Sequence, residues 1–172
     1  VFFTRLDAED MLQGWMLLLY NLATVDAIIL PLSVATLASR SCELEHKGNT
    51  WKLLETMASP HRLYAAKLGW GALVLAVLLI IRSGLFLAVG MALDFSGPIP
   101  WGRFALFTLI SWAVSMMVYA LQQGLSLWFA NQAAALICGI SGSFLGILSM
   151  LFPPALIRFV PWGYYGLMAL VG

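Results

Sequence analysis

Residues 68–93 read LGWGALVLAVLLIIRSGLFLAVGMAL, and this stretch decides the fold class. Its single charged residue is Arg82. About 20 consecutive apolar residues are enough for a helix to cross the hydrocarbon core of a bilayer. A helix suits that environment because it satisfies its backbone hydrogen bonds internally. The stretch therefore predicts a transmembrane helix.

Composition extends this prediction to the whole chain. Of the 172 residues, 62% are hydrophobic and 10% are charged, whereas soluble domains are about 45–50% apolar and about 25% charged. This excludes a soluble globular enzyme, and nine Lys and Arg against eight Asp and Glu leave no basic face for nucleic acid. We expect an all-α integral membrane protein, a polytopic helix bundle that forms one transmembrane domain over residues 1–172.

Polar and helix-breaking residues divide the rest of the apolar sequence into further spans. The turn at 94–100 is rich in Gly and Pro, and Pro153-Pro154 ends the fourth span because proline cannot continue a helix. The chain begins at Val1 rather than Met, so we expect a fragment or short form without a first membrane helix. Besides 68–93, the predicted spans are about 15–38, 103–127 and 132–152, with the start of another at 162–172.

The basic residues predict which side of the membrane each connection faces. Cytoplasmic loops of membrane proteins carry an excess of Lys and Arg, so residues 39–68 are expected in the cytoplasm and residues 94–100 on the other side. The other connections hold one basic residue each, Arg5, Arg103 and Arg158. The segment between the first two spans holds Arg40, Lys47, Lys52, Arg62 and Lys67.

Residues 39–67 carry helix signals of their own and are predicted to form a cytoplasmic helical elbow. Ser41 suits the N-cap of a short helix that Gly48 ends, and residues 51–58 suit a second helix. Ser59-Pro60 starts a third helix that continues into the next span. Acidic residues of the elbow nearly balance its basic ones, whereas a helix on the bilayer surface favours an excess of Lys and Arg. The elbow is therefore better suited to docking a soluble partner than to lying on the bilayer.

Two blocks of sequence resemble a known family. Residues 45–54, EHKGNTWKLL, resemble the cytoplasmic motif of type 2 ABC exporter permeases, and in particular of lantibiotic-immunity (bacteriocin self-protection) permeases. Residues 122–133, QQGLSLWFANQA, followed by the glycine-rich fourth span, are similar to the segment between two later spans of the same permeases. Those proteins have six spans, so this chain is expected to lack the first and most of the last.

The resemblance implies a fold, a function and partners. The fold would be that of a type 2 exporter, and the chain a transport subunit rather than an enzyme. It would pair with a second permease subunit, homologous or identical, and with two ATPase subunits that hold ATP and magnesium. It would lie in the bacterial plasma membrane and export an antimicrobial peptide or a related amphipathic compound. The elbow would couple to the ATPase through Glu43, Glu45, His46, Lys47, Thr50, Trp51 and Lys52.

Two charges lie inside the predicted spans. Asp26 is twelve residues from Ala38 and Arg82 is thirteen from Gly69, so at about 1.5 Å per residue both lie at nearly the same depth. A lone charge in the bilayer interior is costly, which predicts a mutual ion pair facing the bundle interior. The pair serves either as a bridge that specifies the fold or as part of a transport path.

Other classes of function remain to be weighed against the permease. In a secondary transporter or channel, Asp26 and Arg82 would form the ion or proton site, but such proteins often show an internal repeat and none is visible here. An intramembrane enzyme would need a catalytic Asp pair, an HExxH motif or a Ser–His arrangement, and the spans contain none. The two His and two Cys have no metal-ligand spacing, so we expect no metal and no cofactor in this chain.

The fourth predicted span carries a stripe of small residues. Small side chains let helix backbones approach closely in a membrane, so we expect this stripe to face another helix, either within the chain or in a second subunit. The stripe includes a GxxxG match and consists of Ala135, Gly139, Gly142, Gly146 and Ser149.

Overall fold

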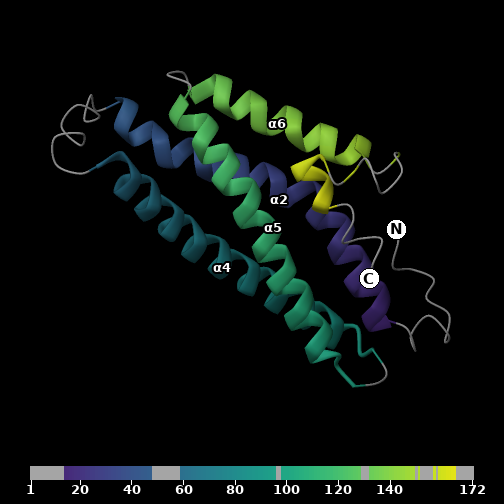
Figure 1. The fold of residues 1–172 in the computed structure, drawn as a ribbon. Coiled ribbons are helices and arrows are strands. Elements are labelled where there is room, and N and C mark those ends of the chain that lie inside the picture. Colours follow the sequence, from purple (N-terminus) through teal and green to yellow (C-terminus); the bar gives the residue numbers. More distant parts are fainter. Residues whose placement is uncertain are drawn as a thin grey trace.

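The computed structural model describes residues 14–47, 59–95, 98–128, 132–149, 151, 157 and 159–165. This part of the chain is helical throughout its regular structure (Figure 1). Its elements are α2 (Gly14–Lys47), α4 (Pro60–Ala92), α5 (Trp101–Trp128), α6 (Gln132–Ser149) and the short 3₁₀ helix η1 (Pro161–Gly163).

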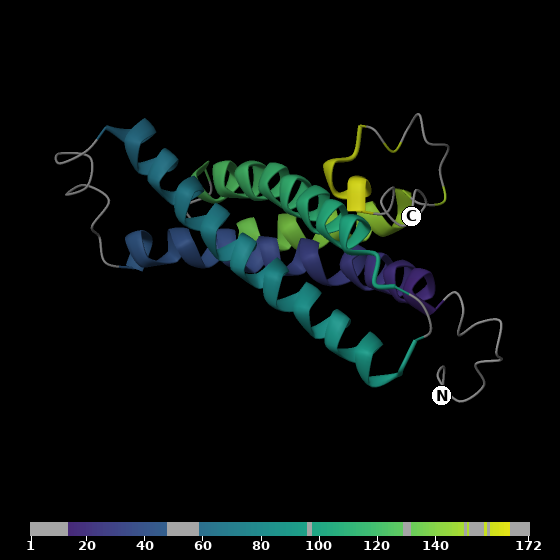
Figure 2. The ribbon, with the colours of Figure 1, turned by 90° about the horizontal axis from the view of Figure 1, so that it is seen from below.

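The four α-helices form one bundle in which successive helices run in opposite directions (Figures 1 and 2). Helix α2 lies against both α5 and α6, while α4 packs mainly on α5. Three helices contain segments long and apolar enough to cross a membrane, at Gly14–Ser41, His61–Ala92 and Trp101–Ser126. The apolar part of α6, Leu136–Leu148, is shorter. The predicted fold class, an all-α membrane helix bundle, is confirmed.

Helix α2 corrects one detail of the predicted elbow. The sequence places a break and a new N-cap at Ser41, but α2 continues through Ser41 as far as Lys47. The Ser41 hydroxyl donates a hydrogen bond to the carbonyl of Ala38, 2.8 Å away, within the same helix. Nothing between Ala38 and Lys47 opposes the helix, because that stretch contains neither Gly nor Pro. The predicted stop at Gly48 lies outside the described residues.

The start of α4 agrees with its sequence signals. Ser59 is the N-cap residue in an extended conformation, and Pro60 occupies the first helical turn. The Ser59 side chain makes no capping bond; its hydroxyl lies 3.3 Å from Nε2 of His61 instead. The helix then runs without a break from the elbow into the apolar span, as predicted. Residues 48–58, which include the second predicted elbow helix, lie outside the described residues.

The turn between α4 and α5 reverses the chain at the end of the bundle opposite the elbow. Asp94 has φ = 52°, a left-handed conformation that Asp adopts more readily than most residues. Its amide donates to the carbonyl of Met91 at 3.2 Å, which closes the end of α4. The following Phe95 is buried against Trp15 at the start of α2, with ring centroids 5.6 Å apart in an edge-to-face arrangement. The turn is therefore fixed to α2.

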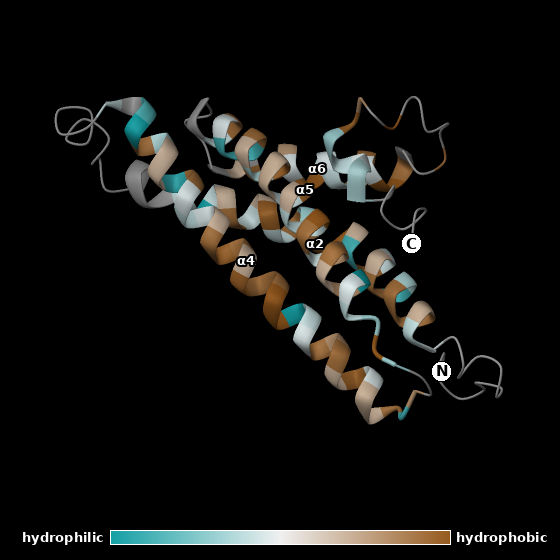
Figure 3. Ribbon diagram, turned by 60° about the horizontal axis from the view of Figure 1, so that its bottom comes forward, coloured by the Kyte–Doolittle hydropathy of each residue, from teal (hydrophilic) through white to brown (hydrophobic). Residues whose placement is uncertain are grey.

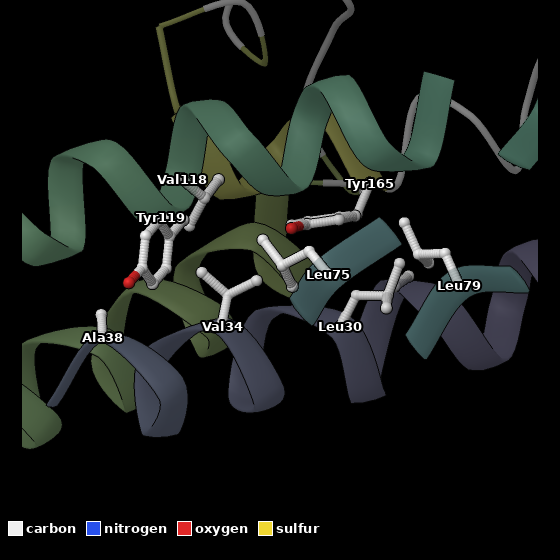
Figure 4. Packing of buried hydrophobic residues seen from close by; sticks show 9 residues of the cluster. Leu30, Val34, Ala38, Leu75, Leu79, Val118, Tyr119 and Tyr165 are labelled. Atoms are coloured by element: carbon white, nitrogen blue, oxygen red, sulfur yellow. The ribbon is translucent and has the colours of Figure 1, made fainter. Parts of the chain in front are cut away.

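Two hydrophobic clusters hold the bundle together. One surrounds Trp15, Leu22, Phe95 and Phe104 near this turn. The other lies closer to the elbow, where side chains of α2, α4 and α5 and Tyr165 point toward one another (Figure 4). Its labelled members are Leu30, Val34, Ala38, Leu75, Leu79, Val118, Tyr119 and Tyr165.

The outer faces of the long helices are apolar over most of their length (Figure 3). Trp70 and Trp101 are both 62% exposed, as expected for indoles at a membrane–water boundary. Trp15 and Trp162 are less exposed, because Trp15 fills the cluster around Phe95 and Trp162 covers glycines of α6.

Candidate functional site

An ion pair inside the bundle joins α2 to α4. Asp26 is 2% exposed, and Nη1 of Arg82 donates to its Oδ2 atom. Ser111 of α5 lies on the same carboxylate oxygen, with Oγ 3.5 Å from Oδ2. Three helices thus meet at one carboxylate, and the structure brings together the two intramembrane charges that the sequence places at equal depth. The contact with Ser111 was not foreseen, because nothing in the sequence sets the rotation of α5.

The Nη2 atom and the face of the guanidinium group contact α4 and α5. Nη2 of Arg82 donates to the hydroxyl of Ser83 at 3.3 Å, and that hydroxyl lies 2.7 Å from the hydroxyl of Thr108. The guanidinium carbon is 5.6 Å from the centre of the Phe107 ring, within the range of a cation–π contact. Pairing and hydrogen bonding of this kind offset the cost of taking a charge out of water.

A second polar cluster ties the same three helices where the elbow joins the bundle. Lys67 is 9% exposed, and its ammonium group donates to the carbonyl of Ser41 on α2 at 3.0 Å. The hydroxyl of Tyr119 on α5 lies 3.4 Å from the carbonyl of Lys67. The hydroxyl of Tyr64 donates to the carbonyl of Ala120 at 2.9 Å. We call Ser41, Tyr64, Lys67 and Tyr119 the elbow base.

Glycine makes room for this contact. A Cβ atom at Gly71 would lie 2.7 Å from the Tyr119 hydroxyl oxygen, so the ring of Tyr119 passes over α4 only because position 71 has no side chain. Sequence reasoning counted Lys67 among the charges that indicate the cytoplasmic side and missed its burial. The spacing of Tyr64, Lys67 and Gly71 by three and four residues is the signal that could have shown a shared face of α4.

Comparison with known proteins identifies the family. A model of the family described as "ABC-2 family transporter protein" matches residues 1–152. The chain belongs to this family. No curated protein and no solved structure matches it. The chain is therefore a membrane permease subunit of an ABC transporter, and membership implies that it works with ABC ATPase subunits.

Four of the seven residues carried over as coupling positions can be placed in the permease. The last turns of α2 contain Glu43, Glu45, His46 and Lys47, which are therefore a continuation of a membrane helix and not part of a separate short helix. Thr50, Trp51 and Lys52 lie outside the described residues. Among the residues that are described, no three His, Cys, Asp or Glu side chains could hold a metal ion together.

The glycines of α6 face the permease's own chain. A Cβ atom at Gly139 would lie 2.5 Å from Cβ of Ala35 on α2 and 2.9 Å from Nε2 of Gln122 on α5. At Gly146 it would lie 2.8 Å from the carbonyl oxygen of Trp162, whose indole also covers Gly142. Gly139 therefore packs against two other α-helices. Gly142 and Gly146, the GxxxG pair, pack against Trp162 of the short 3₁₀ helix η1, whereas the sequence predicts that they contact another long helix.

Proposed function

We propose that this permease is the membrane subunit of an ATP-driven exporter in the bacterial plasma membrane. In this proposal residues 39–67 face the cytoplasm and contact the ATPase subunits, and a second permease subunit completes the transporter. The observation that carries the proposal is the elbow base. There α4 is tied to α5 through Tyr64 and Tyr119, and it is tied to α2 through Lys67.

The length of α2 supports a role in transmitting motion. At about 1.5 Å per residue, its 34 residues extend about 51 Å, well beyond the hydrocarbon core of about 30 Å. The segment that carries Glu43 and Glu45 is continuous with the segment that carries Asp26. A displacement at the cytoplasmic end of a continuous helix moves its membrane part as well, so an ATPase bound to the elbow could shift α2 directly.

The ion pair fits the same proposal as a bridge that specifies the fold. It links α2 to α4 in the interior of the bundle, while the elbow base links them again near the end of the apolar segments. A secondary transporter that uses Asp26 as its ion or proton site is less favoured, because the carboxylate is engaged by both Arg82 and Ser111. An antimicrobial peptide or a related amphipathic compound is proposed as the exported molecule on the resemblance of residues 45–54 to lantibiotic-immunity permeases.

The coupling role is tested with the Trp51→Ala variant of the complete permease, produced together with its ATPase. We expect normal membrane insertion and reduced ATP hydrolysis, because the variant removes a bulky side chain from the proposed docking surface. Trp101→Ala is the matched control, since Trp101 is 62% exposed at the opposite end of the bundle. Normal hydrolysis and normal export by Trp51→Ala would exclude the coupling role. Stimulation of hydrolysis by candidate peptides tests the substrate.

A further inference from the structure

An open groove runs between α4 and α5 on the outside of the bundle. It has a volume of about 640 Å³, within the range of about 300–1,000 Å³ that is usual for small-molecule sites. Leu79 and Phe104 line its buried side and are 1% and 3% exposed. Small residues keep the groove open, and a Cβ atom at Gly84 would meet nothing within 4 Å. The small lining residues are Ala76, Gly84 and Ala105.

The groove offers a bound molecule very little hydrogen bonding. Apart from two indoles, the polar side chains among its described lining residues are Ser83 and Thr108. Thr108 donates to the carbonyl of Phe104 at 2.8 Å. Its hydroxyl therefore accepts from Ser83, 2.7 Å away, and Ser83 accepts in turn from Nη2 of Arg82. Both hydroxyl hydrogens are used within the protein, so the groove suits an apolar ligand.

The length of the groove matches one leaflet of a bilayer. Its lining extends from Trp101 to Trp112 on α5 and from Ala76 to Leu87 on α4. Each interval corresponds to about 16 Å at about 1.5 Å per residue, close to half of a hydrocarbon core of about 30 Å. Trp101 is exposed at the start of α5, where an indole suits the membrane–water boundary. At the inner end, the indole nitrogen of Trp112 donates to the carbonyl of Ala72 at 3.0 Å.

The groove is continuous with the surface that the permease presents to the membrane. Both helices contain segments long and apolar enough to cross a bilayer, and Ile80 and Leu109 at the groove are 65% and 61% exposed. We propose that the groove binds one acyl chain of a phospholipid from the leaflet at the α4–α5 turn. The chain enters beside Trp101 and ends at Trp112. This inference goes beyond the proposed function, since it requires neither the ATPase nor a second permease subunit.

The chemistry of the groove favours a lipid tail over an exported peptide. A peptide carries backbone amides and carbonyls, and burying them without hydrogen-bonding partners is costly. A hydrocarbon chain has no such groups. Bound beside Ser83 and Thr108, the chain excludes water from the side of the bundle where these hydroxyls hold Arg82. Water weakens the attraction between charges, so the bound chain protects the ion pair between Asp26 and Arg82.

Photolabelling by a lipid with a reactive acyl chain tests the site. The full permease is reconstituted in vesicles of equal parts phosphatidylethanolamine and phosphatidylglycerol, with a trace of phosphatidylglycerol that carries a diazirine at mid-chain. Labelled residues are identified by mass spectrometry. Gly84→Leu fills the groove. Gly69→Leu is the matched control, because position 69 is also exposed on α4 and open around its Cβ position, but lies outside the groove.

We expect groove residues of both helices to be labelled in the wild type and in Gly69→Leu, and at least several-fold less in Gly84→Leu. Leu73, which is 57% exposed on α4 outside the groove, is the internal reference and should be labelled equally in all three. Ala105→Leu, which fills the groove from α5, should lower groove labelling as Gly84→Leu does.

Either of two results would overturn the proposal. Equal groove labelling of the wild type, Gly84→Leu and Gly69→Leu would mean that lipid only lies against the outer faces in general. Displacement of the label from the wild-type groove by a cationic amphipathic peptide would assign the groove to an exported molecule instead. Because labelling requires no ATPase, its outcome is independent of the Trp51→Ala experiment.

Discussion

Asp26 and Arg82 show how a pair of charges can exist in a bundle made almost entirely of apolar side chains. The carboxylate receives hydrogen bonds from two other helices, and the guanidinium is held by its own helix and by the ring of Phe107. Each charge needs the other to offset its loss of hydration, because burying a lone charge costs far more than burying a paired one. The energetic importance of each residue therefore depends on whether its partner is present.

This dependence gives a prediction at the residue scale. We expect Arg82→Ala to destabilise the permease by about 3–5 kcal/mol, the usual cost of removing one member of a buried pair. The double variant Asp26→Ala/Arg82→Ala should be less damaging, because it leaves no unpaired carboxylate. Unfolding of the purified protein in mixed micelles, followed by circular dichroism for all members of the cycle, measures this. Purely additive effects would mean that the two charges do not stabilise each other.

Lys67 is a second residue whose role follows from its contacts. Lys67→Met keeps the length and the apolar stem of the side chain but removes the ammonium group that reaches the carbonyl of Ser41. We expect the variant to insert and assemble with its ATPase, but to export less substrate per ATP hydrolysed, because α2 is no longer tied to α4 at the elbow base. Lys67→Arg, which retains a donor, is the control. A ratio of export to hydrolysis equal to wild type in Lys67→Met would exclude this role.

At the scale of elements, the small residues of the bundle divide into those that are covered and those that are open. Gly142 and Gly146 are covered by Trp162, and Gly139 by α2 and α5, whereas a Cβ atom at Gly84 would meet nothing within 4 Å. The same residue type therefore serves as a contact at Gly142 and as an open surface at Gly84. A small-residue stripe in the sequence does not distinguish the two.

The difference predicts opposite outcomes for the same substitution. Gly142→Leu should destabilise the permease by about 1–3 kcal/mol, the range for overpacking a filled site, because the new side chain must displace the indole of Trp162. Gly84→Leu should change stability by less than about 0.5 kcal/mol, as surface substitutions usually do. Thermal unfolding of the two variants in one detergent compares them directly. Equal stability of both variants would show that Trp162 does not hold α6.

At the scale of the whole molecule, the two ends of the bundle differ in the residues that they carry. The carboxyl-terminal turns of α2 and the amino-terminal turns of α4 lie at one end, while the turn between α4 and α5 lies at the other (Figure 3). The first end holds Arg40 and Lys67. Under the positive-inside rule the first end faces the cytoplasm. We expect His61→Cys, in the chain without its native cysteines, to be labelled only after the membrane is permeabilised, and Trp101→Cys to be labelled in intact cells. The reverse pattern would contradict the proposed orientation.

The sequence alone determined the features that depend on local chemistry. The apolar stretches specify the membrane spans, and Ser59-Pro60 specifies the start of α4. Residue counting placed Asp26 and Arg82 at one depth, because the helical rise is fixed. The family could be recognised because its motifs are short runs of consecutive residues, which can be identified without knowledge of the fold.

Tertiary structure decided which side of each helix is covered and by what. Helix α2 continues through Ser41. A residue that could cap a helix does not interrupt one when no neighbouring Gly or Pro breaks it. Tertiary structure also buried Trp15 and Lys67 and placed Trp162 over the glycines of α6. These features depend on the rotation of helices about their axes and on contacts between different elements of the chain. Hydropathy and spacing fix the position of a residue along its helix but not the neighbour it meets across the bundle.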